Sequence, residues 1–251
     1  MKKLPFFSVL VMAIVFTLPE KKKIKIFMAG DSTMSIKDTK AYPETGWGMP
    51  FVYFWDSTVS VVNRAKNGRS TKTFISEGLW KSIMDEAREG DYVFIQFGHN
   101  DEAKEKGERY ATPDTFRMNL TRFVKESREK GATPVLFTPV SRRKFDTTGT
   151  AIETHKEYSA YVKEVAAKEN VLFIDLDTKS RELYQQMGKG DSKLLFLQLK
   201  PGEHPNYPDG KDDNTHFTEL GARLIAQLVL KELRELKIEL TERVFIPPVK
   251  K

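Results

Sequence analysis

The apolar positions of this 251-residue chain fall into five short runs separated by longer amphipathic stretches. The runs are rich in β-branched and aromatic residues, and several are continuously apolar, which is typical of strands covered on both faces. They occupy residues 24–29, 59–63, 92–97, 134–138 and 171–175. Because strands of this kind alternate with helical patterns, the sequence predicts a parallel sheet with helices on both sides.

The amphipathic stretches predict helices at residues 48–55, 71–88, 112–130, 152–168 and 217–236. The third has signals at both ends, since Thr112 precedes a proline and Gly131 follows a basic residue. No repeat, low-complexity tract or linker divides the chain, so we predict one domain over residues 21–251. The segment 189–214 reads as a long loop rich in Pro and Gly, and we expect it to be functional because such loops are uncommon in compact domains.

The first 20 residues have the pattern of a signal peptide. A basic start is followed by an almost wholly apolar run over residues 4–18. This run is shorter than the roughly 20 residues that a membrane span needs, but it suits a signal-peptide core. We therefore expect a protein that is exported to the periplasm or the extracellular space, with no stable membrane insertion afterwards. No clear cleavage motif precedes the lysines at 21–23, so an uncleaved anchor stays open as an alternative.

Composition narrows the chemistry further. The chain has no cysteine, which excludes disulfides, thiolate zinc sites and a thiol nucleophile. Its formal net charge of +6 fits an acidic polymer as substrate, although it also fits no particular partner. The basic residues are scattered among acidic ones, so we do not expect nucleic acid to bind.

Polar residues follow three of the predicted strands, where the carboxyl ends of a parallel sheet form ligand sites. Ser32 follows the first, Gly68 the second, and His99 and Asn100 the third. A serine hydroxyl becomes a useful nucleophile only when a positioned imidazole takes its proton. The sequence should therefore supply a base elsewhere.

The strongest candidate for this base is His216, because Asp213 stands three residues before it. Residues three apart share a face in a turn or first helical turn, so Asp213 could orient the imidazole. A capping Asp with an unrelated histidine is the alternative. Of the other histidines, we expect His155 on the solvated surface of a helix and His99 in a structural role. Donors for an oxyanion could come from the backbone N–H of Ser32 and Gly68 and from the side-chain amide of Asn100.

Four blocks in this order resemble those of the SGNH/GDSL hydrolases. They are Gly-Asp-Ser at 30–32, Asn-Arg-Ala-Lys-Asn-Gly at 63–68, Gly-His-Asn-Asp at 98–101 and Asp-Asn-Thr-His at 213–216. The resemblance implies a flavodoxin-like three-layer α/β/α fold with a five-stranded parallel sheet, and no metal or cofactor. It also implies that Ser32 is the nucleophile, that Asp213 and His216 complete the triad, and that Ser32, Gly68 and Asn100 form the oxyanion hole.

The extended blocks Gly-Asp-Ser-Thr-Met at 30–34, Gly-Trp-Gly at 46–48 and Gly-Arg-Ser-Thr at 68–71 are similar to those of the rhamnogalacturonan acetylesterases. That branch implies acetylated pectin as the substrate. Trp47, Trp80 or Tyr207 could provide platforms for sugars, with core packing as the alternative. Arg69 could pair with a uronate carboxylate, or it could simply be solvated.

Three other functions stay open. The first is an acetylesterase for xylan or another acetylated sugar, and the second is a carbohydrate-binding protein without catalysis. The third is a metal-dependent phosphoesterase, whose hard ligands would be Asp31, Asp101, Asp212, Asp213 and His216. The sequence does not indicate an oligomeric state.

Overall fold

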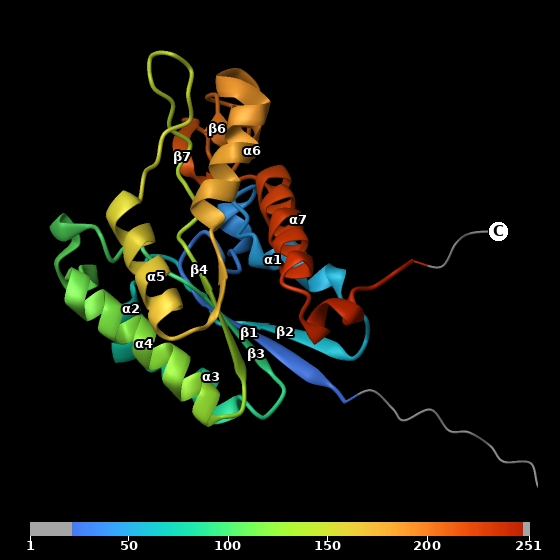
Figure 1. The fold of residues 1–251 in the computed structure, drawn as a ribbon. Helices are drawn as coiled ribbons and strands as arrows, with labels where there is room; N and C mark the ends of the chain where they lie inside the picture. The colour runs from blue at the N-terminus through green and yellow to red at the C-terminus, as the bar shows by residue number, and fades with distance from the viewer. Residues whose placement is uncertain (1–21, 248–251) are drawn as a thin grey trace, which may run out of the picture.

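A five-stranded parallel sheet forms the middle layer of the protein in a computed structural model that describes residues 22–247 (Figure 1). The strands are β1 (Ile24–Gly30), β2 (Val59–Asn63), β3 (Tyr92–Gln96), β4 (Thr133–Phe137) and β5 (Leu172–Ile174). Their order is β2-β1-β3-β4-β5, and every neighbouring pair is parallel. The predicted sheet and its flavodoxin-like fold class are thus confirmed. The predicted signal peptide lies outside the described residues.

The strand order reverses between β1 and β3. From β1 the chain first adds β2 on one side, and then returns to add β3, β4 and β5 on the other. β1 and β3 pair so that Gly30 lies opposite Gln96, the last residue of each strand. The segments that follow these two strands therefore begin side by side, at the point where doubly wound sheets bind their ligands.

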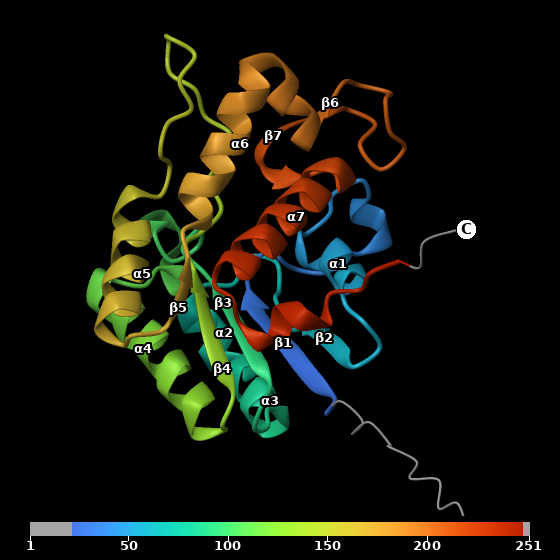
Figure 2. The ribbon, with the colours of Figure 1, turned by 45° about the vertical axis from the view of Figure 1, so that its right-hand side comes forward.

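Helices cover both faces of the sheet (Figures 1 and 2). One layer consists of α1 (Gly48–Phe51), α6 (Leu176–Asp191) and α7 (Glu219–Glu235), and the other of α2 (Thr71–Ser76), α3 (Leu79–Glu86), α4 (Pro113–Glu129) and α5 (Lys156–Lys168). Successive side chains of a strand point to opposite faces. Accordingly, Ile26 and Met28 belong to the first core, and Phe27 and Ala29 to the second.

Several helix predictions need correction. The predicted helix 71–88 is divided into α2 and α3, because Gly78 adopts a left-handed φ of +75° that interrupts the helix. The predicted helix 48–55 is α1 followed by a 3₁₀ turn, and the predicted helix 152–168 begins only at Lys156. Helix α6 was not predicted at all. None of the described helices is long and apolar enough to span a membrane.

The predicted loop 189–214 contains regular structure. A 3₁₀ helix, η4 (Ser192–Leu195), leads into an antiparallel pair of strands, β6 (Phe196–Leu199) and β7 (Lys211–Phe217). Figure 2 shows this pair beside α6 and apart from the central sheet. The pair is held by Phe196 and Phe217, whose rings pack 5.2 Å apart in the first core.

Helix α7 packs so tightly on η4 that it has no room for a methyl group at Gly221. A Cβ built there would lie 2.0 Å from the carbonyl oxygen of Leu195. Gly-to-Ala changes inside helices usually stabilise, by up to about 1 kcal/mol. Here we expect Gly221→Ala to lower the free energy of unfolding by about 1–3 kcal/mol through overpacking. Thermal unfolding followed by circular dichroism measures the effect.

Gly190→Ala in α6 is the matched control, because a Cβ there meets nothing within 4 Å. Its melting temperature should stay unchanged or rise. Equal shifts in the two variants would contradict the proposed steric limit at Gly221.

Candidate active site

The structure brings Ser32, His216 and Asp213 together at the end of the sheet. Nε2 of His216 lies 2.9 Å from the Ser32 hydroxyl oxygen, and Nδ1 of the same ring lies 2.7 Å from Oδ2 of Asp213. When Nδ1 carries the proton that the carboxylate accepts, Nε2 is left as an acceptor facing the serine hydroxyl. This arrangement can remove a proton from Ser32.

An irregularity in β7 places Asp213 and His216 on one side of the strand. Phe196 pairs with Phe217 and Gln198 with Asp212, so two steps along β6 correspond to five along β7. Bulges of this kind change the direction of side chains that would otherwise alternate. Oδ1 of Asp213 accepts the backbone N–H groups of Thr215 and His216, at 2.7 and 3.0 Å, which closes the bulge. The expected turn or helix start is therefore a bulged strand.

The same contacts keep Asp213 ionised. Burial opposes the charge, but the hydrogen bond and charge of the His216 ring, together with the N–H groups of His216 and Thr215, hold the pKa of this carboxyl well below its usual range. An ionised Asp213 fixes the tautomer of His216 and stabilises the imidazolium that would form when the ring takes a proton.

Gly68 and Asn100 line the same cavity as Ser32 and His216, and this cavity has a volume of about 390 Å³. Gly68 has a left-handed φ of +74°, a conformation that favours glycine. Nδ2 of Asn100 donates one hydrogen to the carbonyl of Arg69 at 3.0 Å, which orients the amide and leaves its second hydrogen for a ligand.

A chain of buried hydrogen bonds supports the segment that contains Ser32. The indole N–H of Trp47 donates to Oε1 of Gln96 at 2.7 Å, and Nε2 of Gln96 donates to the hydroxyl of Thr33 at 2.6 Å. That hydroxyl in turn donates to Oδ1 of Asp31 at 2.8 Å. Ser32 thus lies between two residues that are fixed to the end of β3.

The aromatic residues expected to bind sugar do not lie in this cavity. Trp47 is fully buried in the first core. Trp80 is 1% exposed, donates to Glu126 and packs on Phe123 with ring centroids 4.1 Å apart. Neither indole therefore has a face free for a substrate.

Tyr207 and Arg69 are also engaged elsewhere. The Tyr207 hydroxyl donates to the carbonyl of Ala41 at 2.8 Å. Arg69 pairs with Glu77 at 2.9 Å, and it lines an adjacent cavity instead of the one at Ser32. Both residues lie near site residues in the sequence, but their side chains contact other parts of the protein.

The histidines His99 and His155 are both buried, and only His99 lines the Ser32 cavity. His155, expected at the surface, is 1% exposed, and its Nδ1 lies 2.9 Å from Oε1 of Glu102. The expectation was wrong because His155 precedes α5 and turns inward against His99, at 4.2 Å between rings. His99 is buried as well, but its edge contributes to the wall of the Ser32 cavity.

Further residues of the cavity wall were not anticipated from the sequence. They are Glu44, Asn67, Lys106, Arg109, Arg142 and Thr215. Oδ1 of Asn67 accepts from the Ser35 hydroxyl at 2.6 Å and from Nζ of Lys37 at 2.8 Å, so its amide N–H₂ group is directed elsewhere. Asn67 stands within the second sequence block, which was the available signal. The three cations come from polar turns that carry no motif.

The residues of the alternative metal site have separate partners. Asp31 accepts from Thr33, Asp101 from Thr71, Asp212 from Gln198, and Asp213 from His216. Within residues 22–247, no group of three or more His, Asp or Glu side chains is arranged to hold a metal ion.

Residues 29–224 match the GDSL-like lipase/acylhydrolase family. The chain is 44% identical over 222 residues to the rhamnogalacturonan acetylesterase RhgT of Bacillus subtilis, covering 88% of this chain and 94% of that protein. It is 37% identical over 220 residues to the probable rhamnogalacturonan acetylesterase YesY of the same organism, covering 87% and 96%.

Two solved structures share the fold. The protein YxiM of Bacillus subtilis matches with a TM-score of 0.76 and 24% identity, covering 87% of this chain and 58% of that one. Axe2, an acetylxylan esterase of Geobacillus stearothermophilus, matches with a TM-score of 0.58 and 16% identity, covering 84% and 94%.

Asp101, next to Asn100, is a fully buried carboxyl with a perturbed pKa. Its Oδ1 accepts from the N–H and the hydroxyl of Thr71 at 2.8 and 2.6 Å, while Oδ2 has no hydrogen-bond partner among the described residues. Burial raises the pKa of Asp101 to about 7, with a further contribution from the charge of Asp31 and against the hydrogen bonds from Thr71.

This shift predicts how Asp101 affects stability. In the unfolded chain the carboxyl ionises near pH 4, but in the folded protein it keeps its proton until about pH 7. As pH rises through this window the unfolded state is favoured, so the free energy of unfolding falls. Asn cannot ionise. The melting temperature of Asp101→Asn relative to the wild type should therefore increase from pH 4 to pH 7 and then level off.

The exposed Asp209 supplies the control, and Asp209→Asn should follow the wild type across the same pH range. A constant difference between Asp101→Asn and the wild type from pH 4 to pH 8 would contradict the raised pKa.

Proposed function

The chain belongs to the GDSL-like lipase/acylhydrolase family, a family of carboxylic ester hydrolases, and on this premise we propose that it removes O-acetyl groups from a rhamnogalacturonan-type pectic polysaccharide. The observation that carries the proposal is the Ser32–His216–Asp213 hydrogen-bonded series, which opens into a cavity shared with Gly68 and Asn100. The 44% identity to the acetylesterase RhgT supports the choice of polymer.

In the proposed reaction, Ser32 attacks the acetyl carbonyl carbon while Nε2 of His216 takes the hydroxyl proton. The resulting oxyanion is stabilised by N–H donors from the backbone of Ser32 and Gly68 and from the side chain of Asn100. His216 then gives the proton to the departing sugar hydroxyl, which leaves an acetyl ester on Ser32. Water, activated by the same imidazole, hydrolyses this ester and releases acetate.

We also propose that the protein is exported, on the strength of its basic start and the apolar run over residues 4–18. An extracellular or periplasmic location would give the enzyme access to plant polysaccharide. Mass spectrometry of the protein recovered from a secreting host would test this, and an intact N-terminus in the cytoplasm would contradict it.

Acetate release from acetylated rhamnogalacturonan, compared with acetylated xylan, tests the proposed function. We expect the wild type to release acetate from the pectic polymer and Ser32→Ala to lose turnover by a factor of at least about 10⁴. A chelator is present throughout, so that a contaminating metal enzyme does not contribute.

Release from xylan alone would refute the pectic substrate and leave the serine mechanism in place. Appreciable turnover by a correctly folded Ser32→Ala protein would refute the nucleophile. Circular dichroism of this variant provides the check on folding.

Asp213→Asn tests the role proposed for the carboxylate. The amide keeps the shape of the side chain but can donate to Nδ1, which favours the wrong imidazole tautomer and removes the charge that stabilises the imidazolium. In a well-studied protease triad the same change lowers kcat by about 10⁴, and we expect a loss of similar order here with little change in KM.

Asp212→Asn is the matched control, because Asp212 is the exposed neighbour of Asp213 and its carboxylate accepts from Gln198 instead. Steady-state kinetics on the same acetylated polymer should show it close to the wild type. Equal losses in the two variants would point to disruption of the β6–β7 pair.

A further inference from the structure

Three cationic side chains border the Ser32 cavity. Lys106 and Arg109 belong to the 3₁₀ helix η3 (Lys104–Arg109), which follows β3, and Arg142 follows β4. The acidic residue in the same wall is Glu44, and its carboxylate is already paired with Nζ of Lys37 at 2.6 Å. The cavity therefore has an excess of positive charge beside the serine.

Among the described residues, few side chains neutralise the charge of these three cations. The side chains of Lys106 and Arg109 form no ion pair or hydrogen bond with the residues in the range 22–247. Arg142 donates to the Thr215 hydroxyl at 2.7 Å and has only a distant pairing with Glu102, at 3.7 Å. By contrast, the nearby Arg69 is satisfied by Glu77 at 2.9 Å. Unpaired charge is thus available to a ligand at the rim of the site.

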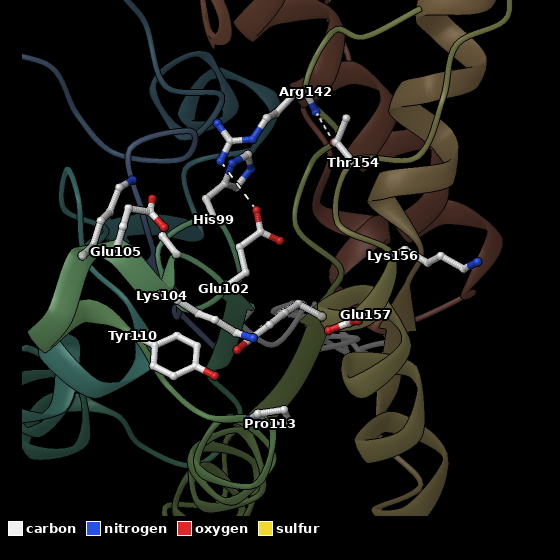
Figure 3. Close-up of a pocket in the computed structure, with 13 residues that line it drawn as sticks. His99, Glu102, Lys104, Glu105, Tyr110, Pro113, Arg142, Thr154, Lys156 and Glu157 are labelled. Atoms are coloured by element: carbon white, nitrogen blue, oxygen red, sulfur yellow. Dashed lines mark hydrogen bonds and ion pairs between the residues drawn. The ribbon is translucent and has the colours of Figure 1, made fainter. Parts of the chain in front are cut away.

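The same cations connect the Ser32 cavity to its neighbours. A cavity of about 720 Å³ shares His99, Lys106 and Arg142 with it, and Figure 3 shows Arg142 beside His99 with its guanidinium toward Glu102. Another, of about 290 Å³, shares Gly68, Lys106 and Arg109. Lys106 therefore borders all three cavities, which adjoin one another at this side chain.

The guanidinium of Arg109 also lies against Gly68. A Cβ built on Gly68 would be 3.1 Å from Nη1 of Arg109, so the guanidinium covers the glycine that borders the reaction cavity. A planar guanidinium in this position can take a carboxylate through two parallel N–H donors.

We propose that Lys106, Arg109 and Arg142 form a carboxylate-binding rim that accepts uronate carboxylates of the polymer near the ester, and that this rim selects an acidic polysaccharide over a neutral one. The inference rests on the proposed function, because the rim is defined by its position beside the proposed nucleophile Ser32. A galacturonate-containing polymer supplies a carboxylate for such a rim, whereas an unsubstituted xylan backbone supplies none. Charge at the mouth of a cavity also raises the local concentration of an oppositely charged ligand, in a salt-dependent way.

Binding of unacetylated oligogalacturonate, measured by isothermal titration calorimetry, tests the rim without any catalytic turnover. The carboxyl-reduced oligosaccharide of equal length is the neutral comparison. We expect the wild type to bind the acidic form at least about tenfold more tightly than the reduced form, and this preference to weaken between 50 and 500 mM salt.

The double variant Lys106→Ala/Arg109→Ala should bind the acidic ligand roughly tenfold more weakly and the reduced ligand with unchanged affinity. Arg109→Lys should lose less affinity for the acidic ligand. Lys125→Ala is the matched control, since Lys125 is an exposed lysine on α4 that lines none of these cavities and has no ion pair among the described residues. It should bind as the wild type does.

Equal binding of the acidic and reduced ligands by the wild type, or an equal loss in the Lys125→Ala control, would overturn the rim. Acetate release, measured separately, decides the proposed function. If the wild type binds oligogalacturonate through the rim but releases no acetate, the proposed function fails while the rim stands. The converse result, with acetate released but no charge preference, removes the rim alone.

Discussion

The active-site geometry depends on one buried chain of hydrogen bonds at the point where the strand order reverses. It runs from Trp47 through Gln96 to Thr33 and Asp31, and all four side chains are essentially inaccessible to water. Inside a low-dielectric core, the free-energy penalty of leaving a polar group without a partner exceeds the net stabilisation from one hydrogen bond. Such a chain of hydrogen bonds therefore tolerates few alternative arrangements. The segment after β1 is consequently fixed to the end of β3, and the position of Ser32 is defined by residues that do not line the cavity.

A second local constraint places His216, the proposed base, beside Ser32. In a regular strand, Asp213 and His216 would point to opposite faces, because side chains alternate. The five-to-two mismatch between β7 and β6 removes this alternation, and Oδ1 of Asp213 stabilises the bulge by accepting two backbone N–H groups. One carboxylate therefore shapes the backbone with one oxygen and orients the imidazole with the other. This dual use also accounts for a pKa held low despite burial.

Sequence patterns predicted the features that depend on short, local stretches of the chain. The five parallel strands, and the polar residues just after β1, β2 and β3, were read from apolar runs and from the rule on carboxyl ends. Residues that depend on distant contacts were not predictable in this way. An indole such as that of Trp47 can serve as a sugar platform, but this one donates its N–H to Gln96 inside the core. His155 is buried against Glu102 and His99, which lie more than 50 residues away in the sequence. The β6–β7 pair was missed because β6 is only four residues long, β7 is mostly polar, and the connection between them is rich in Pro and Gly.

Substrate preference can be set by the loops around the cavity, independently of the sheet that carries them. In the proposed mechanism, the sheet and the segments that carry Ser32, Asp213 and His216 serve the acyl-transfer step. That step is the same for any acetyl ester, and a fold by itself does not define a substrate. The rim cations come instead from η3 and from the turn after β4, both outside the regular elements of the sheet. Loops on a rigid scaffold can change without disturbing the core. Under the proposed rim, a change of polymer within this architecture would therefore require a change of charge at Lys106, Arg109 and Arg142, and no change at Ser32.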